Sequence, residues 1–517
     1  MLVSNPLTYL YLKRPALTCC ISYVQPNNHI SLPPRNAVAV WSATIAVWAA
    51  MLTGTALGAF WLWQQPDLLA SDDALFFSRG LTFFSVMEFS PHFPGYPGFI
   101  WLGQALLSIT ENSTEAILFA TRSSSLLLPW LSYGLLRAVG CSPTNALLGF
   151  LLCITEPLLL GLGLQGLSES PALCWLAAAC WLIYCRQYSL TGLVFGVCLA
   201  TRPSYAPIVL PLILWFIYYL PECRRRLLFG VGFIALISLG FVLAHDGTGY
   251  FIEGWRFIDG HFSLWGNSML MKSQQQNWYQ TVSGYYGNGL VLLIALAGIA
   301  AATLFSLLNK AFLYKHSADL ENSPEPPVSI TPTKNSRNPA KRIEFRYLNP
   351  ELLITTILLI SGLTWTLIAQ NPDNLRHLAP IIWTGIILIC LLLNKVNHSI
   401  QWLAAIVLTG ASIWHMQLQL RWNPTAPAIH QAMEWLSDRQ PSILVSNHGI
   451  ELLRHNLPAF AVADAYYPGT AKRIIDQGGW RLSATQLDHS NLLLTARFLA
   501  RSPADKPLWI YHQAVRK

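Results

Sequence analysis

The first long apolar segment constrains the fold more than any other feature of this chain. Ala37 to Trp63 contains no charged residue, and a helix of this length can cross a hydrocarbon core about 30 Å thick, which needs ~20 residues. Charged residues make up only 11% of the chain, whereas about a quarter of the residues in an ordinary soluble protein are charged. We therefore expect an integral membrane protein that retains this segment as a helix rather than losing it as a signal peptide.

Further apolar segments predict about eleven spans in total, several of them shorter than the usual ~20 residues. After the first, they are residues 115–139, 142–163, 171–184, 190–200, 205–220, 227–244, 289–308, 351–369, 378–393 and 400–416. Residues 95–109 are also apolar, but they are fewer than a span needs and open with prolines. We expect this segment to be juxtamembrane or re-entrant rather than spanning.

The distribution of basic residues predicts the topology. The formal net charge of +8 would suit nucleic-acid binding, but the basic residues stand beside apolar segments, as the positive-inside rule requires. If residues 95–109 do not span, the side of the N-terminus carries Arg137, Arg186, Arg224–Arg226, Lys310 with Lys315, and Lys395. The prediction is a multi-pass protein of the plasma membrane, the inner membrane of a bacterium, with a cytoplasmic N-terminus and no nucleic-acid partner.

The chain is expected to contain an all-α polytopic membrane domain followed by a small extracytoplasmic α/β domain. Residues 1–36 would be a cytoplasmic tail, residues 37–416 the membrane domain and residues 417–517 the α/β domain, with 309–347 a flexible cytoplasmic linker rich in Pro, Ser and Asn. Beyond Trp422, short strand-like and helix-like segments alternate. The expected strands are residues 442–447, 458–464 and 507–515, and the expected helices are 450–454, 472–477 and 491–501.

Two adjacent carboxylates, Asp72 and Asp73, open the first predicted external loop, in the sequence SDDALFFSRGLTFFSVMEFSPHFPGYP. Ser71 could cap a helix whose first turn carries both acids, and this alternative needs no function. The helix would be amphipathic, with Arg79 in water and these side chains free to face lipid: Phe76, Phe77, Phe83 and Phe84. A proline-rich turn with His92 and Tyr96 then leads into the apolar segment 95–109.

This combination of an acid pair, an amphipathic helix, a His/Pro turn and many spans resembles the GT-C class of integral-membrane glycosyltransferases. The resemblance is closest to the branch that contains protein O-mannosyltransferases and the aminoarabinose transferases that modify lipid A. It implies that Asp72 is the catalytic base and that Asp73 takes the second acidic position. The second acid is Asp where the family commonly has Glu, and HFPGYP replaces the usual HPPL or KPPL turn.

The resemblance gives roles to other polar residues at predicted membrane depth, where charge is costly. Glu169 matches an acid that faces the active site, although it could instead cap the helix begun by Ser168. Arg202 matches a basic residue that meets the lipid phosphate, which a guanidinium can bind through two donors; snorkelling to the interface is the alternative. Arg376 and His377 lie in another short external loop, where they could approach the phosphate or the sugar.

The implied function is transfer of a sugar from a polyprenyl phosphate-linked donor to a lipid, glycan or protein acceptor, with inversion at the anomeric carbon. His92, Tyr96, Glu169 and His377 would contact substrate. No P-loop or Rossmann glycine pattern occurs, which agrees with a lipid-linked donor rather than a nucleotide sugar. No cofactor is predicted with certainty and no metal ligands are assigned, although a divalent metal is left open.

Other functions remain open from the sequence. A lipid or solute transporter or flippase would also need many spans and charges within the membrane. A scaffold whose α/β domain binds a partner and an oligosaccharyl- or phospho-group transferase are further alternatives. The external segment 245–286 mixes aromatic residues such as Trp255 and Tyr279 with polar ones. This mixture suits either a sugar or a membrane interface.

Overall fold

The computed structural model describes residues 34–221, 223–265, 277–287, 350–465, 478–487 and 492–513. The predicted span 289–308, the predicted linker 309–347 and the predicted helix 472–477 lie outside these residues. The chain divides into two compact units, residues 1–48 and 49–517. Everything that positions the candidate site belongs to the second unit.

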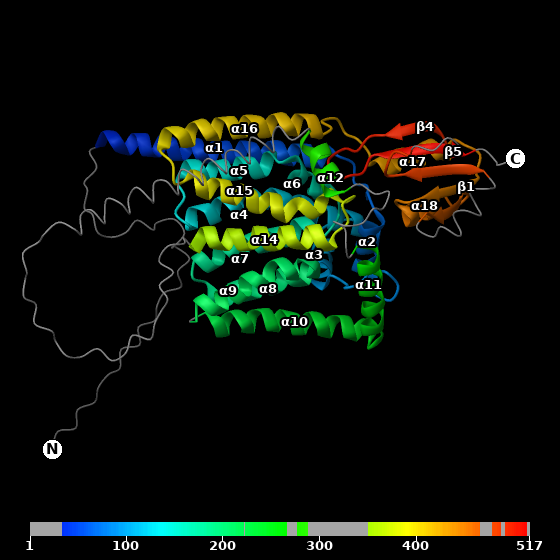
Figure 1. The fold of residues 1–517 in the computed structure, drawn as a ribbon, viewed down its shortest axis with the longest axis horizontal. Helices are drawn as coiled ribbons and strands as arrows, with labels where there is room; N and C mark the ends of the chain where they lie inside the picture. Colours follow the sequence, from blue (N-terminus) through cyan, green and yellow to red (C-terminus); the bar gives the residue numbers. More distant parts are fainter. Residues whose placement is uncertain are drawn as a thin grey trace, which may run out of the picture. The chain divides into compact units, whose positions relative to one another are not determined.

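Long helices running side by side form most of the second unit (Figure 1). They are α1 (Pro34–Gln64), whose residues from Ala49 on belong to this unit, α4 (Ser113–Ala138), α5 (Pro143–Thr155), α7 (Glu169–Tyr184), α8 (Tyr188–Thr201), α9 (Ala206–Tyr219), α10 (Arg224–Asp246), α14 (Pro350–Ala369), α15 (Ala379–Leu393) and α16 (His398–Gln419). Buried apolar side chains of α4, α5, α7, α8, α9, α14 and α15 make one continuous core.

Fewer helices than expected qualify as spans by length and hydropathy. Among the described residues, four helices are long and apolar enough to cross a membrane, or six if each of two bent pairs counts as one span. The predicted span 142–163 is bent by 55° at Glu156, since Pro157 begins a new helix, α6 (Pro157–Gly161). The predicted spans 190–200 and 205–220 are separate helices joined by a 116° bend. The number of eleven is therefore not confirmed.

The outer faces of the bundle remain apolar. Leu57 on α1, Leu236 on α10 and Ile406 on α16 are 63%, 71% and 67% exposed. Water would not tolerate such continuous apolar surfaces on a monomer, whereas lipid chains cover them without cost. The segment predicted to be juxtamembrane contains α3 (Pro97–Leu107), whose 11 residues are too few for a span.

Helix α2 (Asp72–Thr82) begins at the acid pair and lies toward the end of the bundle that faces the sheet (Figure 1). Arg79 and Phe83 are exposed, as expected for an amphipathic helix. However, Phe77 and Phe84 are only 2% and 7% exposed, so the prediction that they face lipid is wrong. Phe77 packs edge-on against Phe99 of α3, and this contact buries the inner face of α2.

In its described residues, the C-terminal part is a five-stranded mixed sheet with two helices. Its elements are α17 (Ala428–Ser437), β1 (Ile443–Ser446), α18 (Ile450–Asn456), β2 (Ala461–Asp464), β3 (Gly479–Ser483), β4 (Leu492–Phe498) and β5 (Leu508–Gln513). The strand order is β2-β1-β3-β5-β4, with parallel pairing at β2-β1-β3 and antiparallel pairing at β3-β5-β4. Residues 491–501, predicted to be helical, instead contain the edge strand β4. Its ladder with β5 outweighs the helix propensity of its leucines.

The α/β part shares its apolar core with α2 and α3. Phe77 and Phe99 belong to the same buried cluster as Leu452 of α18 and Ile510 of β5. The acid pair therefore stands on a helix that is packed into the α/β part. This arrangement fixes the carboxylates relative to both the bundle and the sheet.

Candidate functional site

Four charged side chains form a network at the end of the bundle nearest the sheet. Asp73 lies at the start of α2, Glu169 at the start of α7, Arg202 just after α8, and Arg376 in the short helix η3 (Leu375–Leu378). Arg376 Nη2 is 2.8 Å from Asp73 Oδ2, and Arg376 Nε is 3.0 Å from Glu169 Oε1. Arg202 Nη2 is also 3.0 Å from Glu169 Oε1. Positive and negative groups thus alternate through the cluster.

The centre of this network is almost sealed from solvent. Glu169 and Arg202 are 2% and 7% exposed. Arg202 Nη1 donates to Ser168 Oγ at 3.0 Å. Glu169 Oε2 is buried and has no hydrogen-bond partner within the described part of the chain. Burying an ion pair costs several kcal/mol of desolvation per ion, which attraction between the charges offsets only in good geometry, so stability alone is a poor reason for this arrangement.

A small pocket lies beside the network. Its polar wall includes Glu169, Arg202, Arg376 and His377, and its apolar residues include Ile208, Trp365 and Pro380. Tyr205 also lines the pocket, 5.5 Å from the Arg202 guanidinium to the ring centre. The Tyr205 hydroxyl is buried and has no hydrogen-bond partner among the described residues. The pocket therefore offers two guanidinium groups and a spare hydroxyl beside apolar walls.

The two carboxylates of the acid pair point to different parts of the molecule. Ser71 caps α2, and its hydroxyl accepts from the amide of Ala74 at 3.4 Å, so the capping alternative describes the backbone correctly. Asp72 Oδ1 accepts from the amide of Leu452 in α18 at 3.0 Å. Asp73 instead pairs with Arg376. Asp72 thus contacts the α/β part, whereas Asp73 belongs to the charged network.

These surroundings shift the pKa values of the two carboxyls in opposite directions. Burial raises the pKa of Asp72 to about 6, although the amide of Leu452 favours its charged form. Burial also opposes ionisation of Asp73, but nearby positive charge outweighs it and holds the pKa of Asp73 well below its usual value. We assign that effect mainly to Arg376, because burial lowers the pKa of His92 and keeps this ring neutral near pH 7. Asp73 is therefore ionised at neutral pH.

The His/Pro turn forms the wall next to Asp73. His92 Nδ1 lies 3.8 Å from Asp73 Oδ1, and His92 Nε2 is 3.2 Å from the Tyr96 hydroxyl. Phe257, on α11 (Gly249–Trp265), stacks on the His92 ring with 5.8 Å between ring centres. Burial raises the pKa of Tyr96 to about 12, so its hydroxyl remains protonated. His92 and Tyr96 can thus exchange hydrogen bonds with a ligand beside Asp73.

The external aromatic residues do not line the pocket. Trp255 on α11 and Tyr279 on α12 (Trp278–Tyr286) are 74% and 81% exposed. His261 of α11 points inward, with Nε2 2.9 Å from the carbonyl oxygen of Ala369. This placement favours the membrane-interface alternative for the outer aromatic side chains.

Two residues of the α/β part lie near the network and were missed in the sequence. Charges on Asp73 and Arg376 act on both His448 and Lys506, so all four lie within electrostatic range. The loop before Lys506 is held by Arg501 and Asp505, which pair at 2.7 Å. Nothing in RSPADKP distinguishes this loop from an ordinary surface turn; only the docking of the α/β part brings it to the site.

No group of three or more His, Cys, Asp and Glu side chains that could hold a metal ion occurs within the described ranges. The oxygen atoms nearest the pocket belong to carboxylates already paired with arginine.

No family model and no curated protein matches this chain. Among solved structures, it is similar to the crystal structure of ArnT from Cupriavidus metallidurans in the apo state. The two share 11% sequence identity at a TM-score of 0.43, over 91% of this chain and 98% of the other. A likeness at this level assigns no function.

Proposed function

We propose that this protein is a GT-C-type glycosyltransferase of the bacterial inner membrane. It would transfer a sugar from a polyprenyl phosphate-linked donor to a lipid, glycan or protein acceptor at the extracytoplasmic face. The observation that carries the proposal is the convergence of Arg202 and Arg376 on one buried carboxylate oxygen, Glu169 Oε1, at the wall of a pocket at the end of the bundle. A lipid-linked donor would enter this pocket laterally from the membrane.

The two arginines are suited to hold the donor phosphate. Each guanidinium offers several donors in a fixed plane that matches phosphate oxygens. Asp73 and Glu169 lie within ion-pairing distance of these guanidinium groups, which lowers the cost of burying them. An entering phosphate would replace part of these contacts. The Tyr205 hydroxyl, which has no partner in the described part of the chain, would add a hydrogen bond.

Asp73 is the better candidate for the base that takes the acceptor proton. It lies in the charged network beside His92, whereas Asp72 accepts a hydrogen bond from α18. A general base must reach the reacting proton and must be ionised at working pH. Phosphate binding would draw Arg376 away from Asp73, and the pKa of Asp73 would then rise toward a value better matched to proton transfer. The family resemblance favours Asp72 instead, so the two assignments make different predictions.

The leaving phosphate would gain negative charge as the glycosidic bond breaks. The guanidinium groups of Arg202 and Arg376, already positioned at the pocket wall, would stabilise that charge. Preorganised electrostatics of this kind often makes the largest single contribution to catalysis. Attack by the acceptor from the face opposite the phosphate would invert the anomeric carbon.

The proposal is tested by transfer of a radiolabelled sugar from a panel of polyprenyl phosphate donors, using membranes that carry wild type, Asp73→Asn or Asp72→Asn. We expect transfer from at least one donor by wild type and a loss of ~100-fold or more in Asp73→Asn. Loss confined to Asp72→Asn would move the base to Asp72. No transfer from any donor and any acceptor fraction would contradict the proposal.

A transporter or flippase is the second candidate, and the two bent helix pairs favour it because broken helices are common in transporters. Such proteins, however, bind their cargo near the middle of the membrane, whereas the charged network here lies at the helix ends. Movement of the labelled donor lipid across proteoliposomes without sugar transfer would support this candidate.

A further inference from the structure

The charges of the candidate site are already balanced before any ligand binds. Asp73 and Glu169 carry two negative charges, and Arg202 and Arg376 carry two positive charges. A phosphate would therefore leave the site with excess negative charge. A protein that binds an anion in such a place gains affinity from one more cation that is not already paired.

Lys506 is a cation on a loop that packs against the segment preceding Glu169. Its ammonium group lies within electrostatic range of Asp73, Arg376 and Asp373, yet it makes no ion pair or hydrogen bond with the residues that the structure describes. The neighbouring His448 cannot serve, because burial lowers its pKa to about 3 and leaves the ring neutral. The bundle supplies the four residues of the network, and Lys506 adds a positive charge near them from the α/β part.

The loop that carries Lys506 is fixed to the bundle. Arg501 is fully buried; its Nε donates to Asp505 Oδ2 at 2.7 Å and its Nη2 donates to the carbonyl oxygen of Leu164 at 2.7 Å. Gln165 donates to Asp505 Oδ1 at 2.6 Å. These contacts hold the residue immediately before Lys506 against the segment that precedes Glu169.

Close packing restricts this loop further. A Cβ atom added at Gly161 would lie only 2.8 Å from the Ser502 hydroxyl oxygen and 2.9 Å from its Cβ. The buried hydrogen bonds and this close approach leave the loop little freedom to move away. The backbone at Lys506 is therefore preorganised, and only the lysine side chain has to adjust to a ligand.

We propose that Lys506 binds the phosphate of the lipid-linked donor together with Arg202 and Arg376, so that the α/β part completes the site. This inference rests on the proposed function for the identity of the ligand. Lys506 is a binding residue in this account and takes no part in bond making or bond breaking. Its loss weakens donor binding, and arginine at the same position retains most of the affinity.

The reactivity of the Lys506 amine gives a direct test in the full chain in lipid nanodiscs. Labelling by an amine-selective reagent would be followed by mass spectrometry alone and with polyprenyl phosphate, polyprenol or inorganic phosphate. Because burial lowers the pKa of Lys506 to about 8, we expect labelling to rise with a midpoint near pH 8. Both phosphate-bearing probes should protect Lys506, whereas polyprenol should not. Lys395, exposed at the opposite end of α15, is the internal control and should stay unprotected.

Binding affinities complete the test. We expect Lys506→Ala to weaken polyprenyl phosphate binding about 10-fold, Lys506→Arg less than about 3-fold, and the control Lys395→Ala not at all. Protection by inorganic phosphate without binding of polyprenyl phosphate would support an anion site at Lys506 but would contradict the proposal that the donor is lipid-linked. If wild type and Lys506→Ala bind polyprenyl phosphate equally and no probe protects the Lys506 amine, the proposed role of Lys506 is overturned. The proposal of a lipid-linked donor would still stand. Failure of every probe would overturn both.

Discussion

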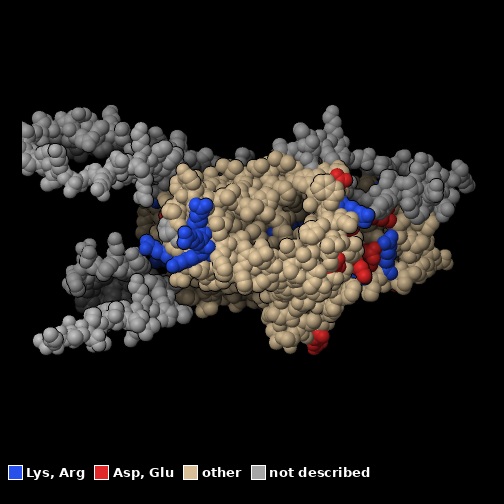
Figure 2. All heavy atoms as spheres, turned by 90° about the horizontal axis from the view of Figure 1, so that it is seen from below, with Lys and Arg blue, Asp and Glu red and all other residues tan. Residues whose placement is uncertain are grey.

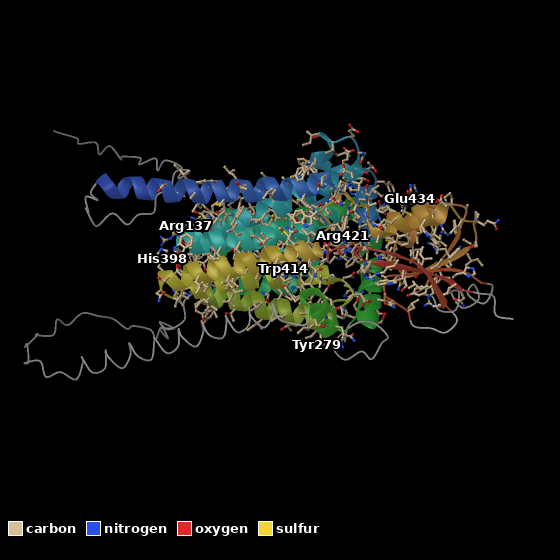
Figure 3. All side chains as sticks on the ribbon, turned by 90° about the horizontal axis from the view of Figure 1, so that it is seen from above. Arg137, Tyr279, His398, Trp414, Arg421 and Glu434 are labelled. Carbon is tan, nitrogen blue, oxygen red and sulfur yellow. The ribbon has the colours of Figure 1, made fainter. Side chains whose placement is uncertain are left out.

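The two ends of the helical bundle carry charge in opposite ways. At the end away from the sheet, Arg137, Arg224–Arg226 and Lys395 are exposed and face solvent, and Figure 2 shows basic side chains gathered on the visible face of that end. Figure 3 shows Arg137 and His398 together at this end and Arg421 toward the other. At the sheet end, Arg202 and Arg376 are paired with carboxylates, and Arg202 is almost fully buried.

This difference separates charge that sets orientation from charge that can bind a ligand. A solvated lysine or arginine at a helix end costs little to place and contributes little to stability. A buried arginine must be compensated by partners, and removing one of them is expensive. Arg137, Arg224–Arg226 and Lys395 share one end of the bundle. The positive-inside rule describes such a group of exposed basic residues, but it gives no reason for burying Arg202.

The largest effect on transfer and stability is expected from a substitution at the sheet end of the bundle. Arg376→Ala leaves Asp73 without its arginine and Glu169 with one arginine fewer, so we predict a loss of transfer of ~100-fold or more. The free energy of unfolding should fall by ~3–5 kcal/mol. Arg376→Lys keeps the charge but loses the planar guanidinium group. Its free energy of unfolding should therefore lie between those of wild type and Arg376→Ala, while transfer stays low. Transfer assays and chemical unfolding in nanodiscs measure both. Equal behaviour of Arg376→Ala and Arg225→Ala would contradict the distinction between the ends.

A pH-dependent effect is expected from Asp72. Its pKa is about 6 in the folded protein and ~3.9 when unfolded, so the folded state binds the proton more tightly. The free energy of unfolding should therefore fall as pH rises from about 4 to about 6, by up to ~3 kcal/mol. Unfolding measured across this range in wild type and Asp72→Asn gives the difference. The lowered pKa of Asp73 affects stability only below about pH 4. There it makes the free energy of unfolding rise with pH, opposite to the effect of Asp72. A difference that is independent of pH would contradict the assignment.

A smaller effect is expected from the hydroxyl of Tyr205. Tyr205→Phe removes a buried group that has no partner among the described residues, so stability should stay the same or rise slightly. Donor affinity should fall by about 3- to 10-fold if that hydroxyl binds the phosphate. Titration of polyprenyl phosphate together with unfolding reports both quantities. A stability loss with unchanged affinity would show that the hydroxyl has only a structural role.

The smallest effects are expected at the exposed end. Arg225→Ala and Lys395→Ala should each change the free energy of unfolding by no more than about 0.5 kcal/mol and leave transfer unchanged. Reporter fusions would check whether insertion orientation depends on these charges. Loss of transfer in correctly oriented Arg225→Ala protein would mean that this end also takes part in function.

The sequence predicts the residues of the charged network well because charge at membrane depth is rare and visible. Glu169 and Arg202 stand out on this ground, whereas Asp73 stands out as part of an acid pair and Arg376 as a basic residue in a short external loop. The structure brings the four side chains together although they are spread over hundreds of residues. Which carboxylate faces the arginines could not be predicted, because adjacent helix positions differ by about 100° in direction. Only the docking of α18 against α2 shows that Asp72 is turned to the α/β part.

Features that depend on tertiary docking escaped prediction. Phe77 was expected to face lipid, but it packs into a core shared with the α/β part. The leucine-rich segment of β4 has the composition of a helix and becomes a strand only through pairing with β5. The position of Lys506 near the network could not be predicted from the neighbouring sequence. It depends on Arg501 and Asp505, which anchor the loop to the bundle.

The most direct test of the account is to locate the lipid phosphate on the protein. Wild type in nanodiscs would be photo-crosslinked with a polyprenyl phosphate analogue that carries a diazirine next to the phosphate, and the labelled peptides would be identified by mass spectrometry. The account predicts crosslinks to the pocket wall around Arg202 and Arg376, reduced by excess polyprenyl phosphate but not by polyprenol. Crosslinks concentrated at the exposed basic end, around Arg137 and Lys395, would contradict it.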